Sequence, residues 1–232
     1  MPDQMPPDPT REALLDAALM HVPFDGWSEA AFRAAVRDAG VDMALARALF
    51  PRGAVDLAVA FHKRGDAAML ERLARADLLG MRMRERIAFA VRVRLEVAGD
   101  KEAVRRGATL FSLPPYAPEG ARLIWGTADA IWTALGDTER DFSYYTKRAT
   151  LAGVYSSTVL FWLGDDTPDS SATWAFLDRR IEDVMRFEKA RQNPVMKGVL
   201  AGPEWVFDRL RSRTPRDASD MPGRWSRPTP QE

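Results

Sequence analysis

Apolar residues recur every three or four positions along almost the whole chain, and this spacing constrains the fold more than any other feature. It is the period of an amphipathic helix, whereas the strict alternation of a half-buried strand is missing. The sequence therefore predicts an all-α protein. We expect four helices in the first 70 residues and five more, at about residues 77–98, 101–112, 118–136, 139–163 and 170–190.

The first four predicted helices have a helix-turn-helix layout. Their expected N-cap or first-turn residues are Thr10, Ser28, Asp42 and Pro51. Gly40 stands between the second and third helices, where a left-handed residue belongs. The stretch AAVRDAGVDMALARALFPRG resembles the DNA-binding domain of TetR-type regulators in form. Its recognition helix, MALARALF, offers only Arg47 to bases and phosphates, so the chemistry fits DNA poorly.

Composition excludes several classes of function. Lys and Arg match Asp and Glu at 33 each, so the net charge steers no partner, and without cysteine there is no disulfide or thiolate. The two histidines, His21 and His62, are too few for a His-rich metal site, and nucleotide-binding and nucleophile motifs are missing. We therefore predict no catalytic residue, no metal and no cofactor.

We expect neither a secretory signal peptide nor a membrane span. The start, MPDQMPPDPTR, does not read as a signal peptide, and no stretch approaches the ~18 apolar residues of a membrane span. We expect a cytoplasmic protein that is neither secreted nor membrane-spanning.

The second half of the chain is rich in tryptophan, and the chain as a whole holds seven Trp and eleven Phe. The segment LIWGTADAIWTALG, residues 123–136, carries one charge, Asp129, so we expect neighbours to cover it nearly all round and Asp129 to lie at its rim. These rings either fill a core or line an apolar cavity that takes an apolar ligand. Candidate lining residues are Trp125, Trp132, Tyr155, Val159, Trp162 and Trp174.

The segment FSYYTKRATLAGVYSSTVLFWL, residues 142–163, has two apolar stripes. The first, predicted to face the core, comprises Phe142, Tyr145, Ala149, Ala152, Ser156, Val159 and Leu163. The second is displaced around the helix and comprises Tyr144, Arg148, Leu151, Tyr155 and Trp162. The second stripe either is buried between helices or faces a ligand or a partner protein.

The segment VMKGVLAGPEWVFDRLRSR, residues 195–213, combines apolar strips with basic residues. Such a helix lies on an anionic membrane surface or docks on its own domain, and the sequence leaves both open. The candidate membrane-binding residues are Val195, Met196, Val199, Leu200, Trp205, Val206 and Leu210.

Three stretches resemble one known family. DFSYYTKRATLAGVYSSTVLFWLGDDTPDSSATWAFLDRRIEDVM, residues 141–185, resembles the C-terminal signature of the ubiquinone-biosynthesis accessory proteins that bind lipid and assist demethoxyubiquinone hydroxylase. HVPFDGWSEAAFRAA and ALFPRGAVDLAVAFHKRGDAAM resemble the family's N-terminal half. The resemblance implies a TetR-like fold without DNA binding and an apolar cavity that holds an aromatic isoprenoid. It also implies presentation of that lipid to the hydroxylase, a di-iron enzyme, by a protein whose C-terminal amphipathic helix touches the membrane.

The resemblance also implies a partner-binding surface. The family pattern Asp-Phe-Asn-Trp-Tyr-Thr-(Lys/Arg)-Arg is matched by residues 141–148, with Ser143 in place of Asn and Tyr144 in place of Trp. The residues that would contact the hydroxylase are Asp141, Tyr144, Tyr145 and Arg148.

We thus expect a TetR-like helical bundle in five parts: a disordered start (1–9), a helix-turn-helix-like domain (10–66), a larger lipid-binding domain (67–191), a membrane-contacting helix (192–213) and a disordered tail (214–232). The expected function is non-enzymatic binding of ubiquinone intermediates for the hydroxylase. It would be carried out on the inner face of a bacterial cytoplasmic membrane, or on the matrix side if the protein is mitochondrial. A homodimer is possible. The alternatives are a TetR-type regulator that senses an apolar ligand and, with no catalytic residues to support it, an enzyme acting on a lipid.

Overall fold

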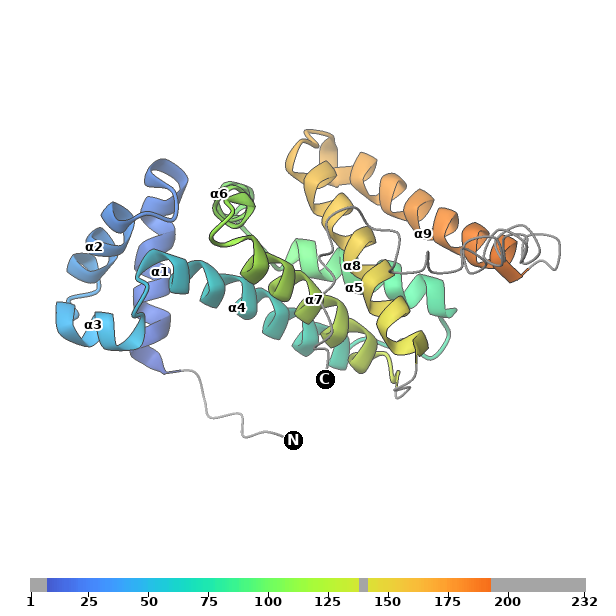
Figure 1. The fold of residues 1–232 in the computed structure, drawn as a ribbon, viewed down its shortest axis with the longest axis horizontal. Coiled ribbons are helices and arrows are strands. Elements are labelled where there is room, and N and C mark those ends of the chain that lie inside the picture. Colours follow the sequence, from blue (N-terminus) through green and yellow to red (C-terminus); the bar gives the residue numbers. More distant parts are fainter. Residues whose placement is uncertain (1–7, 138–141, 193–232) are drawn as a thin grey trace, which may run out of the picture. The chain divides into compact units, whose positions relative to one another are not determined.

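The computed structural model describes residues 8–137 and 142–192, which form nine α-helices and a short 3₁₀ helix without any strand (Figure 1). The elements are α1 (Pro9–Asp25), α2 (Glu29–Asp38), α3 (Met43–Leu49), α4 (Ala54–Ala74), α5 (Met83–Glu96), α6 (Lys101–Ser112), α7 (Ala117–Ala134), α8 (Phe142–Leu163), η1 (Pro168–Ser170) and α9 (Ser171–Gln192). The all-α prediction is confirmed. The described residues divide into two compact units between Asp183 and Val184, and α1 to α8 lie in the first.

Side-chain caps and one glycine set the ends of the first helices. Ser28 and Asp42 each accept backbone N–H groups at the start of the helix that follows, and Gly40 has a φ of +63°. These three expectations are confirmed. The expectation that Thr10 caps the first helix is wrong, because Asp8 accepts the N–H of Thr10 at 2.8 Å and α1 begins one residue earlier.

Two helices begin later than the sequence predicts. Pro51 does not start α4, because Gly53 has a φ of +58° and separates the proline from the helix. Similarly, α5 begins six residues after the predicted position 77. There, Oδ1 of Asp77 accepts the N–H of Leu79 at 3.1 Å, and this local turn competes with the helix.

The helix-turn-helix-like helices share a core with the rest of the first unit. Helix α1 packs against α2, α4 and α6, and Ala103 of α6 belongs to the same buried cluster. The indole N–H of Trp27 donates to the carbonyl of Ala103 at 3.1 Å, which fixes α6 to the start of α2. The predicted domain boundary at 66/67 falls inside the continuous helix α4, so one helix serves both parts. The buried apolar side chains include Leu14, Leu15, Val22, Phe32, Phe50 and Leu57.

Helix α7 is less enclosed than predicted. It packs against α4, α6 and α8 through buried residues such as Leu123 and Ile131. The expectation of nearly complete cover is wrong, because Gly126, Thr133 and Ala134 are exposed. These are small residues, so leaving them in water exposes little apolar area. One face of α7 is therefore exposed to solvent.

The stripe of α8 predicted to face the core is exposed at its start and half-buried or buried farther along the helix. In the stripe predicted to face the core, Tyr145 is 60% exposed and Ala149 is exposed, although Leu163 is buried; the side chain of Phe142 lies outside the described part. The displaced stripe is the buried one, with at most 6% exposure of Arg148, Leu151, Tyr155 and Trp162. A helical pattern predicts that a charged residue faces outward, whereas here Asp129 of α7 and Asp137, just after α7, supply carboxylates that allow Arg148 to face inward.

Arg148 of α8 is held by the end of α7. Its Nε donates to Oδ1 of Asp129 at 2.5 Å and its Nη1 to Oδ2 of Asp137 at 2.9 Å, while the guanidinium lies 3.4 Å from the ring centre of Tyr144. Lys147 adds a second donor to Asp137 at 3.0 Å. Burial opposes ionisation of Asp137, but these hydrogen bonds outweigh it and hold the pKa of this carboxyl below its usual range. Arg148 thus joins α7 to α8.

Replacing Arg148 by methionine should strongly destabilise the fold. The Arg148→Met variant keeps the bulk of the side chain but leaves Asp129 and Asp137 without their shared counter-charge. We expect the free energy of unfolding, measured in urea, to fall by about 3 kcal/mol. The control is Arg180→Met, which removes a surface ion pair with Asp183 and should cost less than about 1 kcal/mol. Equal losses in the two variants would contradict a structural role for Arg148.

Two glycines of α7 should respond in opposite ways to alanine. A Cβ at Gly120 would lie 2.7 Å from Cβ of Phe111, so Gly120→Ala should force α6 and α7 apart and destabilise by about 1–3 kcal/mol. A Cβ at Gly126 meets nothing within 4 Å, so Gly126→Ala should stabilise by about 1 kcal/mol through helix propensity. Thermal unfolding of both variants checks this, and a shift of the same sign in both would refute it.

Candidate functional site

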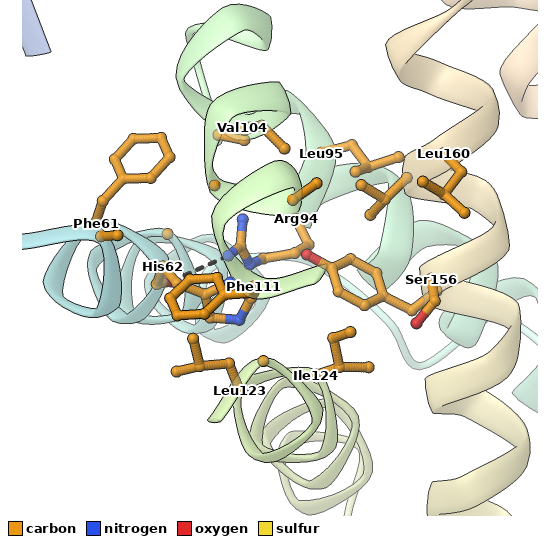
Figure 2. A pocket seen from close by; sticks show the side chains of 18 of the residues that line it. Phe61, His62, Arg94, Leu95, Val104, Phe111, Leu123, Ile124, Ser156 and Leu160 are labelled. Atoms are coloured by element: carbon orange, nitrogen blue, oxygen red, sulfur yellow. Dashed lines mark hydrogen bonds between the residues drawn. The ribbon is translucent and has the colours of Figure 1, made fainter. Parts of the chain in front are cut away.

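A cavity of about 620 Å³ lies between α4, α5, α6, α7 and α8 (Figure 2). Its wall is mostly apolar, and Figure 2 shows side chains from all five helices around it. The larger apolar lining residues include Phe61, Leu95, Val104, Phe111, Leu123 and Ile124. Small residues at helical spacing, such as Ala58, Gly65 and Ala68 on α4, leave the space that the cavity occupies.

The exposed lining residues mark the mouth of the cavity, and the buried lining residues mark its floor. Ser112, Ala117 and Ala121 are exposed, and Leu160 of α8 is 66% exposed. The buried lining residues are Ala58, Gly65, Arg94, Leu95, Ala98, Gly120, Leu123 and Tyr155. The cavity therefore opens to solvent beside the α6–α7 connection and α8, and it ends against α4 and α5.

Arg94 anchors a polar cluster at the cavity floor. It is 4% exposed, its Nε donates to Oδ1 of Asp66 at 2.7 Å, and its Nη2 donates to the carbonyl of His62 at 3.0 Å, the dashed bond of Figure 2. The hydroxyl of Thr127 lies 2.9 Å from both Oδ1 of Asp66 and Nε2 of His62. A Cβ at Gly65 would lie 2.6 Å from Nη1 of Arg94, so only glycine lets the guanidinium lie this close to α4.

Burial controls the charge of His62. Burial, which would strip the cation of its hydration, is the main cause that lowers the pKa of this imidazole to about 4; Asp66 acts in the opposite direction and Arg94 in the same direction as burial. His62 is therefore neutral near pH 7. It can serve as a hydrogen-bonding group of the cavity without adding charge.

The arrangement is suited to holding an apolar molecule that carries a polar group at one end. Most lining atoms are apolar, and the polar side chains gather at the floor. In the part of the chain that the structure describes, no group of three or more His, Asp or Glu side chains could hold a metal ion. Among the described helices, none combines the length and hydropathy needed to cross a membrane.

The structure brings together two of the six predicted lipid-binding residues. Tyr155 and Val159 line the cavity, whereas Trp125, Trp132, Trp162 and Trp174 are not among its lining residues. This cavity therefore does not bring all six residues together, because α8 turns its Tyr155 side toward α5 while the four tryptophans make other contacts.

The four tryptophans have other contacts. The indole N–H of Trp132 donates to the carbonyl of Lys147 at 3.1 Å, and the ring of Trp125 lies 6.4 Å from that of Tyr145. Trp162 and Trp174 line a separate hollow of about 420 Å³. Sequence reasoning missed His62, Arg94, Phe61 and Phe111; the small-residue face of α4 was the signal that could have located them.

The predicted partner-binding residues that the structure describes lie together on α8 but differ in exposure. Tyr145 is 60% exposed, and Tyr144 is half-buried, with its hydroxyl donating to Oδ1 of Asp129 at 3.0 Å. Arg148 is 1% exposed and bound within its own chain, which leaves little of its side chain for a partner to contact. Its role in partner binding stays a prediction. Asp141 lies outside the described residues.

The predicted membrane-contacting segment cannot be placed. Residues 193–232 lie outside the described part of the chain, and with them Val195, Met196, Val199, Leu200, Trp205, Val206 and Leu210. Their membrane contact stays a prediction.

Comparison with known proteins identifies relatives over most of the chain. The sequence model of the COQ9 family matches residues 117–188, which include α7 and α8. The ubiquinone biosynthesis protein COQ9 of Rattus norvegicus, named as mitochondrial, is 32% identical over 180 residues, 74% of this chain and 57% of the relative. The mitochondrial COQ9-B of Xenopus laevis is 30% identical over 210 residues, 86% of this chain and 69% of the relative. The chain thus spans less than two thirds of the length of the Rattus norvegicus protein, and the same holds for the COQ9 proteins of Drosophila melanogaster and Bos taurus.

A solved structure supports the fold. The TetR transcriptional regulator from Nitrosomonas europaea superimposes with a TM-score of 0.63 over 75% of this chain and 97% of the regulator, at 21% identity. The TetR-like architecture predicted from the helix-turn-helix layout is therefore confirmed. Since sequence similarity extends across most of the chain and includes α7 and α8 of the cavity wall, the chain belongs to the COQ9 family.

Proposed function

We propose that this chain is a non-enzymatic accessory protein of ubiquinone biosynthesis. It binds an aromatic isoprenoid intermediate and presents it to demethoxyubiquinone hydroxylase. The names of its relatives support the pathway, since they are called ubiquinone biosynthesis proteins. The single observation that carries the lipid-binding part is the apolar cavity between α4 and α8, with its polar floor and open mouth.

The size of the cavity favours a ring-bearing lipid. Small-molecule sites measure about 300–1,000 Å³, and the cavity of about 620 Å³ falls within that range. It has room for an aromatic head and the first part of a tail. A longer polyprenyl tail would leave through the mouth, where Leu160 offers an exposed apolar rim.

Transfer of such a lipid needs no bond chemistry. Each buried CH₂ group of the tail contributes roughly 0.8 kcal/mol in either a bilayer or an apolar cavity, so exchange between the two is close to thermoneutral. The protein's task is then to meet the membrane surface and to shield the lipid from water. We propose that residues 192–213 make this membrane contact, on the matrix side or on the inner face of a bacterial membrane.

The partner surface that we propose centres on Tyr145. This ring is largely exposed on α8 and lies beside Trp125 of α7 and edge-on to Tyr144, at 5.1 Å between ring centres. Exposed aromatic clusters of this kind are typical centres of protein interfaces. Trp125 thus supplies aromatic area next to the position where Tyr144 replaces the family's tryptophan.

The alternative, a DNA-binding regulator, is not favoured by the geometry of α3. Its one basic residue, Arg47, pairs with Glu29, and its guanidinium lies 4.5 Å from the ring centre of Phe32. Met43 and Leu45 are the exposed large residues of this helix. Sequence-specific DNA binding that weakens steeply with salt would nevertheless favour the regulator.

Purified protein should carry an isoprenoid quinone or a precursor, detected by native mass spectrometry followed by lipid extraction. Val159→Trp, which places a bulky ring in the cavity wall, should reduce the lipid-bound fraction severalfold. Thr150→Trp is the matched control, since residue 150 is half-buried on the same helix but does not line the cavity. Preparations of wild type that never contain lipid would count against the proposed function.

Tyr145→Ala should weaken binding to the purified hydroxylase at least about tenfold, as expected for a central aromatic interface residue. Phe24→Ala removes an exposed ring from α1 and should leave the affinity unchanged. Surface plasmon resonance with both variants, after thermal unfolding has shown that both are folded, makes the comparison. If the two variants bind equally well, Tyr145 does not belong to the interface.

A further inference from the structure

The floor of the cavity is built from charged and polar groups, yet it carries no surplus charge. The guanidinium of Arg94 is paired with Asp66 at 2.7 Å, and His62 is neutral. The other lining cation, Arg64, donates to Glu12 and Asp16 of α1. Both arginines of the cavity wall are therefore already neutralised by carboxylates of the same chain.

The floor also holds hydrogen-bond donors that are not used by the described residues. Tyr155 is 4% exposed and lines the cavity, and its hydroxyl forms no hydrogen bond with any residue that the structure describes. Arg94 uses Nε and Nη2, while its Nη1 forms no hydrogen bond within residues 8–137 and 142–192. The guanidinium lies 6.0 Å from the ring centre of Tyr155, so both groups border the same region of the cavity.

These two features together specify the chemistry of a ligand. Unused donors that border the cavity favour a ligand that brings a hydrogen-bond acceptor, because a ligand that displaced water from them without supplying an acceptor would leave them without a partner. A carboxylate or phosphate would also be an acceptor, but it would enter a buried cluster in which every cation is already paired. Loss of hydration would then act against the anion without compensation. An uncharged oxygen avoids that penalty.

We propose that Tyr155 and Arg94 form a donor pair that selects a lipid with an uncharged, oxygen-bearing head group and disfavours lipids with anionic heads. This inference rests on the proposed function, which it deepens by naming the class of head group. The carbonyl oxygen of a quinone ring or the ether oxygen of a ring substituent fits this description. A fatty acid or a phospholipid headgroup does not.

Binding of three probes with tails of equal length tests the proposal in the full chain by calorimetry. The probes are an alkyl benzoquinone, an alkylbenzene without oxygen, and the corresponding fatty acid anion. Wild type should bind the benzoquinone about three- to tenfold more tightly than the alkylbenzene, as expected for one or two net hydrogen bonds, and the fatty acid more weakly than the benzoquinone.

Tyr155→Phe should reduce the preference for benzoquinone over alkylbenzene while leaving the affinity for alkylbenzene unchanged. The variant should fold, because the tyrosine hydroxyl has no partner to lose among the described residues. Tyr116→Phe removes a hydroxyl that does not line the cavity, and it should bind all three probes like wild type.

Three outcomes would contradict the proposal, and each overturns a different part of it. A wild type that binds the fatty acid as tightly as the benzoquinone would overturn the inferred selectivity. An unchanged preference in Tyr155→Phe would overturn the role of the tyrosine. If wild type binds none of the three probes, the proposed lipid-binding function fails as well, and the selectivity fails with it.

Discussion

The buried pair of Arg94 and Asp66 is the interaction on which the cavity depends. Arg94 reaches from α5 to α4, where it also binds the carbonyl of His62, and it lies close to Tyr155 of α8. Gly65 provides the space for its guanidinium. A collapse that separated Arg94 from these partners would leave a buried charge unpaired, which is unfavourable. The polar floor thus keeps the surrounding helices apart, and small residues on α4 and α6 leave the apolar space above it.

A second buried arginine fixes the other wall. Arg148 joins α8 to the end of α7 through Asp129 and Asp137, so the helix that carries Tyr155 is held at a defined rotation. The same rotation places Tyr145 in solvent on the outer face. Cavity-facing and solvent-facing aromatic residues of α8 are therefore set by one polar network, and a change in that network would move both surfaces together.

The N-terminal helices keep the shape of a DNA-binding domain without its charge pattern. Arg47 of α3 is engaged by Glu29 and Phe32, while α1 packs against α6 through a core that includes Ala103. These helices stabilise the end of α4 that leads into the cavity. In this chain their arrangement is better suited to supporting the cavity than to reading bases, because the exposed side chains of α3 include Met43 and Leu45.

The sequence by itself determined the helical class, most helix ends and the family resemblance, because spacing, caps and Gly40 act between neighbours along the chain. It also placed Tyr155 and Val159 among the ligand-binding candidates. The tertiary structure alone decided which stripe of α8 is buried, since Arg148 can turn inward only where Asp129 of α7 and Asp137, just after that helix, meet it. It likewise decided the cavity floor, because His62, Arg94 and Tyr155 stand on three helices, and burial and pairing between distant residues leave no periodic signal in the sequence.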